Sequence, residues 1–161
     1  MLLVLASGCG RATPAGFWLT YRTDLIKQKF SDQGPWGGVR WILWSSSTPG
    51  TFQASGVMEF AKSKGWSCGD PVQYSQNQLR LWQFAGQPVF PLHFGPADRP
   101  PDDNTVRKFP RYINDDSLVY ECTTGWIRVD PGTARDTDAL GYIQIDKSGS
   151  RMAVYHLWGE I

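Results

Sequence analysis

The feature that most constrains the fold is the C-terminal third, where short alternating apolar and polar segments are separated by turns. The strand-like segments are Ser117 to Thr123, Trp126 to Val129, Tyr142 to Ile145 and Met152 to Trp158. Thr124-Gly125 and Asp146-Lys147-Ser148-Gly149 lie between such segments, and the second is typical of a hairpin turn. Strands joined by short turns favour an antiparallel sheet with one polar face.

The N-terminal half adds further predicted strands. Phe17 to Tyr21 reads as a strand because it is rich in aromatic and β-branched residues, and Val39 to Trp44 reads as a buried central strand. Asp24 to Phe30 fits either a short helix or a strand, so it stays open. A turn or loop is predicted at Gln33 to Gly38, and another turn at Pro49-Gly50.

One helix is predicted from Ser55 to Lys64, with Ser55 as its N-terminal cap and Gly65 ending it in the left-handed conformation. Val57, Phe60, Ala61 and Lys64 fall near one face, so the apolar members of this stripe can pack on a sheet. Farther along, Leu79 to Phe84 reads as a strand buried on both faces.

These elements predict a single α+β domain over residues 17–161, an antiparallel sheet with one or two short helices packed on one face. A chain of 161 residues buries roughly two thirds of its unfolded surface, which is enough for a real core. Between Pro88 and Pro110 the prolines are too dense for a packed helix or a central strand. Residues 95–108 are therefore predicted to form a long surface loop, either functional or simply mobile.

Charge and hydropathy narrow the range of partners. The 16 Lys and Arg nearly cancel the 15 Asp and Glu, and the longest basic run is Arg107-Lys108. This disfavours a nucleic-acid partner, because neutralising phosphates requires a concentrated positive face. The longest apolar stretch, Met1 to Ala6, is far shorter than the ~20 residues of a membrane-spanning helix.

The eight tryptophans are spread from Trp18 to Trp158 rather than clustered. Tryptophan combines a large apolar body with a polar tip, so it suits half-buried sheets and adhesive surfaces alike. Most of these residues are expected in the core or on a sheet face. The alternative is that several of them line a groove for a sugar or a peptide.

The first ten residues run from the apolar Met1 to Leu5, through Ala6-Ser7-Gly8, to Cys9 and Gly10. This order resembles the lipobox at the end of a bacterial lipoprotein signal peptide. The resemblance implies that residues 1–8 are signal peptide, that Cys9 carries the lipid, and that residues 9–16 form the linker. The uncharged Gly10 implies a place on the outer membrane, facing the periplasm. The competing interpretation makes residues 1–8 an N-terminal strand of the sheet.

A third interpretation, a dinucleotide-binding loop opening at Gly8-Cys9-Gly10, fails on spacing. Such a loop requires another glycine where Thr13 stands, and a helix should follow it.

The chain has three cysteines, so acylation of Cys9 leaves Cys68 and Cys122 as an even pair. In an oxidising periplasm this pair can close a loop of some fifty residues, which stabilises the fold by roughly 3–4 kcal/mol. The alternative is two separate buried thiols, since free cysteine is among the most buried residue types.

The sequence contains few signals of reaction chemistry. No G-x-S-x-G motif is present, and the only histidines are His93 and His156. His156 and Glu160 would lie roughly 13 Å apart on a strand, too far for a zinc pair. A cysteine nucleophile needs a reduced thiol, which export disfavours.

The paired acids Asp102-Asp103 and Asp115-Asp116 are typical of solvated loops and turns. Asp130, Asp136 and Asp138 surround Pro131-Gly132 in a predicted loop that could hold calcium, but this segment lacks the third acidic ligand and the glycine of a helix-loop-helix site. No catalytic residue, metal site or cofactor is therefore predicted.

We therefore expect a non-catalytic protein-binding module, an inhibitor, immunity or envelope-assembly protein tethered to the membrane by its lipid. Its candidate binding surface comprises Trp36, Asp98, Arg99, Asp102, Asp103 and Arg107. The alternative is a glycan or peptidoglycan binder that uses exposed tryptophans. A second alternative is an envelope hydrolase using His93 or His156, which needs a carboxylate within about 3 Å of the ring inside a cleft. The partner's identity and the oligomeric state stay open.

Overall fold

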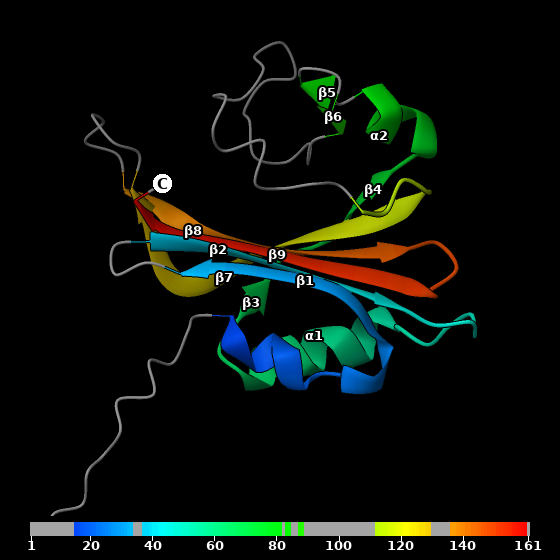
Figure 1. The fold of residues 1–161 in the computed structure, drawn as a ribbon, viewed down its shortest axis with the longest axis horizontal. Helices are drawn as coiled ribbons and strands as arrows, with labels where there is room; N and C mark the ends of the chain where they lie inside the picture. The colour runs from blue at the N-terminus through cyan, green and yellow to red at the C-terminus, as the bar shows by residue number, and fades with distance from the viewer. Residues whose placement is uncertain are drawn as a thin grey trace, which may run out of the picture.

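A computed structural model describes residues 15–33, 37–81, 83–84, 87–88, 112–129 and 136–160. At its centre is a seven-stranded sheet in the order β1-β2-β9-β8-β7-β3, with β4 also paired to β7 (Figure 1). The strands are β1 (Ile26–Gln33), β2 (Gly37–Ser45), β3 (Ser67–Cys68), β4 (Val72–Tyr74), β7 (Ser117–Val129), β8 (Asp136–Asp146) and β9 (Arg151–Glu160). Neighbours are antiparallel, and a short parallel pairing joins β7 to β9 near their ends.

Short helical elements lie on both sides of this sheet (Figure 1). On one side are the 3₁₀ helices η1 (Gly16–Thr20) and η2 (Thr23–Leu25), with helix α1 (Ala54–Ser63). On the other side, next to β4, are α2 (Gln76–Leu81) and the small hairpin of β5 (Gln83–Phe84) and β6 (Gln87–Pro88). The predicted fold class, a single α+β domain with an antiparallel sheet and short helices, is confirmed, but the helices do not share one face of the sheet, because α1 and α2 lie on opposite sides.

The C-terminal hairpin forms as its sequence predicts. Asp146 to Gly149 turns between β8 and β9, and Gly149 has a left-handed φ of 66°. The Asp146 carboxylate accepts hydrogen bonds from the hydroxyls of Ser148 (2.6 Å) and Ser150 (3.1 Å) and from the amide of Arg151 (2.9 Å). The predicted strand Val39 to Trp44 and the predicted turn at Pro49-Gly50 are also present.

The strand prediction for Phe17 to Tyr21 is wrong, because this segment forms η1. Its aromatic residues pack against the sheet instead of extending it. Trp18 is fully buried, and the indole nitrogen of Trp44 donates to the carbonyl of Tyr21 over 2.8 Å. The segment left open, Asp24 to Phe30, divides between the end of η2 and the start of β1.

The strand prediction for Leu79 to Phe84 is wrong for its first half, because Leu79 to Leu81 belong to α2, whereas Gln83–Phe84 form the short strand β5. Ser75 and Gln78 cap each other's backbone amides, over 2.9 Å and 3.2 Å. Asp116, which directly precedes β7, provides a third cap, because its carboxylate accepts a hydrogen bond from the amide of Gln76 over 2.8 Å. These three caps favour a helix over a strand, and Leu79 is buried on it.

Three boundaries differ from the sequence-based expectation. Helix α1 begins at Ala54, so Ser55 lies inside it and is not its cap, whereas Gly65 has the predicted left-handed φ (91°). Thr124-Gly125 is not a turn but an irregularity within β7, where the register with β8 shifts and Gly125 has a φ of 76°. The predicted loop at Gln33 to Gly38 is shorter than expected, because Gln33 already belongs to β1 and Gly37 and Gly38 already belong to β2, where they pair with β9.

Tryptophans build the core between the sheet and α1. Trp18, Trp44 and Trp66 are buried, and the ring of Trp18 meets the other two edge to face. Val57 and Ala61 cover this cluster from α1, as the helical stripe predicts. The structural interpretation of the tryptophans is confirmed for these three.

The opposite face of the sheet has a second core that includes Tyr142, Tyr155 and Ile113. The side-chain amide of Gln144 donates to the carbonyl of Ile113 (3.1 Å) and to the hydroxyl of Ser117 (2.8 Å). The amide of Tyr112 donates to the hydroxyl of Tyr155 over 3.2 Å. Buried polar groups therefore hold residues 112 and 113 across this face.

Gly141 on β8 provides the space that Trp66 occupies. A Cβ atom at position 141 would overlap the indole ring of Trp66 and stand 2.9 Å from Cγ2 of Thr124. The missing side chain thus lets a large ring lie directly on the sheet backbone.

We expect Gly141→Ala to lower the free energy of unfolding by about 1–3 kcal/mol, because the added methyl overpacks a filled core. Gly56→Ala is the matched control: its new Cβ meets no atom within 4 Å, and it should be neutral or stabilise α1 by up to ~1 kcal/mol. Urea unfolding of both variants measures the difference. Equal stabilities would contradict the fit of Trp66 over Gly141.

Candidate functional site

Many residues singled out from the sequence lie outside the described part of the chain. They are residues 1–8, Cys9, Trp36, His93, Asp98, Arg99, Asp102, Asp103, Arg107 and Asp130, together with the predicted loop 95–108. Cys68, Cys122, Asp115, Asp116 and His156 are described, and the site is built from these and their neighbours.

The predicted bridge between Cys68 and Cys122 is confirmed. The two sulfurs are bonded at 2.04 Å, and the residues stand opposite each other on β3 and β7. The alternative of two separate thiols is therefore wrong. Closing a loop with a sequence separation of 54 stabilises the fold by about 4 kcal/mol on the loop-entropy model.

The bridge lies at one end of a row of residues that stand opposite one another on neighbouring strands, from β1 to β3. In register from β1 to β3, the row comprises Ser31, Arg40, His156, Gly141, Cys122 and Cys68. Arg40 donates to the hydroxyl of Ser31 over 3.0 Å. Trp66 covers the middle of this row, with its ring centroid 5.4 Å from that of His156.

His156 is sealed inside this row, with 0% of its surface exposed. Its Nε2 shares a hydrogen bond with the hydroxyl of Thr124 at 3.1 Å, and its Nδ1 has no hydrogen-bond partner among the described residues. Burial, and secondly the charge of Arg40, lower the pKa of His156 to about 3. The ring is therefore neutral at pH 7 and lacks the solvent access that the hydrolase alternative needs at this position.

The lowered pKa predicts a pH-dependent stability. Below pH 6.5 the unfolded chain binds a proton at His156 that the folded chain refuses until about pH 3, so stability falls as pH falls through this window. Between pH 7 and 5.5 we expect the wild type to lose about 1 kcal/mol more than His156→Gln does.

Urea unfolding at the two pH values measures this loss, and His93→Gln controls for removing one titrating group from the unfolded chain. The same pH dependence in the wild type and His156→Gln would contradict a buried neutral ring.

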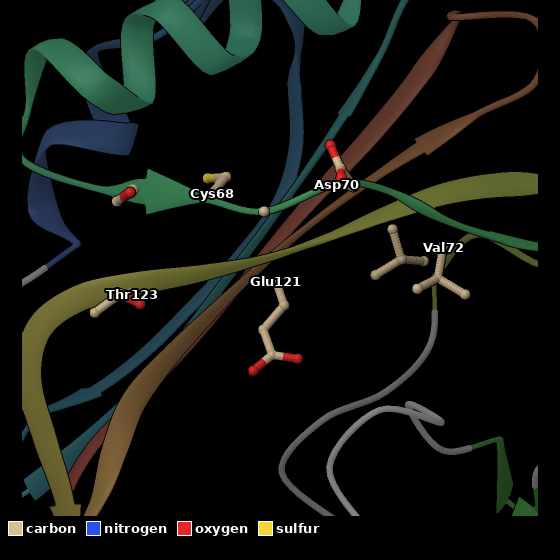
Figure 2. A pocket seen from close by; sticks show the side chains of 8 residues that line it. Cys68, Asp70, Val72, Glu121 and Thr123 are labelled. Carbon is tan, nitrogen blue, oxygen red and sulfur yellow. The ribbon is translucent and has the colours of Figure 1, made fainter.

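A hollow lies along the outer side of β7. There β3 and β4 pair with successive parts of β7 and leave Gly69 to Pro71 between them. We call this hollow the edge groove; its volume is about 510 Å³. It is lined by Ser67, Cys68, Gly69, Asp70, Val72, Val119, Glu121 and Thr123 (Figure 2).

Two carboxylates and an exposed valine give the edge groove its character. Glu121 points away from α1, whereas Asp70 points toward the α1 side, so negative charge lies on both sides of the edge (Figure 2). Val72 is 48% exposed, and the amide of Gly69 donates to the carbonyl of Glu121 over 3.0 Å. The groove can therefore receive cationic and apolar groups from a partner.

A second hollow, of about 430 Å³, lies beside the β8–β9 turn. Two of its acidic side chains have structural roles, because Asp115 forms an ion pair with Arg151 and Asp116 caps α2. This agrees with the turn chemistry predicted for Asp115-Asp116. In the described part of the chain, no three His, Cys, Asp or Glu residues gather as a metal site.

The opposite end of the sheet, β1, has an aromatic surface that the sequence interpretation missed. The ring of Phe30 stacks on Trp41 with centroids 5.2 Å apart, and Trp41 in turn contacts Tyr112 at 4.7 Å. The alternation of Lys29, Phe30 and Ser31 is the signal that could have indicated it, but only once this segment is known to be a strand.

The helices in the described ranges are all too short or too polar to cross a bilayer. Comparison of the chain with protein-family models, with curated proteins and with solved structures gave no match.

Proposed function

We propose that this chain is a periplasm-facing lipoprotein of the bacterial outer membrane that binds another envelope protein and catalyses no reaction. The single observation that carries the proposal is the Cys68–Cys122 bridge, because such bonds persist in oxidising compartments. Cys68 also lines the edge groove, so the same bond supports the binding surface. Inhibition of an attacking enzyme, immunity and envelope assembly are the roles that suit this design.

The chemistry of the edge groove specifies the kind of partner. An extended segment lying along it would direct successive side chains to opposite sides. Lysine or arginine at adjacent positions would then meet Glu121 on one side and Asp70 on the other, with Val72 giving apolar contact. We therefore propose a partner that presents a basic extended segment.

The burial of the tryptophans supports a protein partner over a glycan. Of the five tryptophans whose side chains are described, Trp18, Trp44 and Trp66 are buried and Trp41 and Trp158 are half-buried. Sugar binding requires several open aromatic faces in one shallow groove. The glycan alternative therefore rests on Trp36 and other residues outside the described part.

The lipid at Cys9 would confine the domain to the membrane surface through a linker that is shorter than predicted, because Ala15 is buried in the core and Gly16 begins η1. One acyl chain holds a protein only marginally, whereas two or more anchor it stably. Confinement raises the local concentration of partners, so a modest groove suffices for binding.

A photo-reactive amino acid at Thr123, in the edge groove, tests this proposal in cells that carry the full chain. We expect an adduct with an envelope protein, reduced about fivefold in Asp70→Asn/Glu121→Gln, because two screened charges contribute roughly 1 kcal/mol. The matched control places the same group at Lys62, which is exposed on α1. Equal adducts at both positions, or no adduct at Thr123, would contradict the proposal.

A further inference from the structure

The outer side of β1 is a strand edge to which no other described strand pairs. Among the described strands β1 pairs only with β2, and residues 27–32 are exposed. Phe30 is 40% exposed, and the other exposed large apolar side chain in the described part, Val72, lies in the edge groove. A strand edge to which no described strand pairs is a template for adding another strand.

We infer that β1 pairs antiparallel with β1 of a second copy of this chain, about a two-fold axis at Phe30. Opposite residues in such a pair must project from the same face of the joint sheet, so only registers centred on a residue are allowed. The regular part of β1 begins at Gln28, because its register with β2 shifts between Ile26 and Gln28. The paired segment therefore runs from residue 28 to residue 32.

The side chains select the register centred on Phe30. It places Phe30 opposite Phe30, Lys29 opposite Ser31 and Gln28 opposite Asp32, with no like charges directly opposed. A register centred on Lys29 would set two lysines against each other, and one centred on Ser31 would set Phe30 against Asp32. Only the first register brings aromatic rings together.

The aromatic contacts continue across the two-fold axis. Phe30 already stacks on Trp41 at an interplanar angle of 15°, on the face of the sheet opposite α1. The Phe30-centred register joins the two stacks into one line of four rings, and pairs of this kind stabilise neighbouring strands. The exposed surface of Phe30 is thereby covered.

A five-residue pairing buries less surface than a stable dimer needs in dilute solution. The paired state is therefore favoured where copies are crowded on a membrane, which is the one respect in which this inference rests on the proposed function.

Single cysteines placed in turn at residues 28 to 32 of the full chain test the pairing in native membranes under mild oxidation. At the axis the two Cα atoms stand about 5 Å apart, within disulfide range, whereas at the adjacent positions they stand roughly 8 Å apart. We expect the yield of disulfide-linked dimer to peak sharply at Phe30→Cys. A flat profile, or a peak at another position, would overturn the inference.

A second pair of variants keeps Phe30 in place. Chains carrying Lys29→Cys and chains carrying Ser31→Cys, distinguished by tags, should form a mixed dimer at least about fivefold above either homodimer, because these positions face each other in this register. Equal yields would contradict the pairing. If the dimer forms while Thr123 gives no adduct, the inference stands and the proposed partner falls. If Thr123 gives an adduct while no dimer forms, the proposed partner stands and only the dimer is contradicted.

Discussion

The placement of Trp66 on the bare backbone of Gly141 is the contact on which the rest of the structure depends. The ring also meets Phe17, Trp18 and His156, so it joins η1, the sheet and the segment that leaves α1. Two residues later Cys68 is bonded to Cys122, which fixes that segment to β7. Packing and a covalent bond thus constrain the same stretch of chain from its two ends.

This constraint links the core to the surface. Strand β3 has only two residues, too few to hold an edge by backbone hydrogen bonds alone, and the bridge at Cys68 supplements them. The edge groove begins at these residues, so its shape depends on the bridge. His156, sealed under the same ring, contributes to packing and not to the proposed binding surface.

The sequence predicted the elements whose signals are local. Alternation and turn signals identified β8 and β9, a continuous apolar run identified β2, helical periodicity identified α1, and the even pair of cysteines identified the bridge. It did not identify η1, because its aromatic residues suit a strand as well as a packed helix.

Helix α2 had a local signal, the capping pair Ser75 and Gln78, which the strand interpretation overlooked, whereas its third cap, Asp116, lies 40 residues beyond Gln76. The edge groove was missed because β3 and β4 are defined by their pairing with β7. The long-range partners of the groove and of this third cap leave no local pattern.

The most direct test of this account is the mass of the chain isolated from native membranes, with its peptides mapped without reduction. The account predicts a chain that begins at an acylated Cys9, lacks residues 1–8, and contains a peptide linked through Cys68 and Cys122. A chain that retains Met1 and has three free thiols would contradict the tether, the compartment and the bridge together.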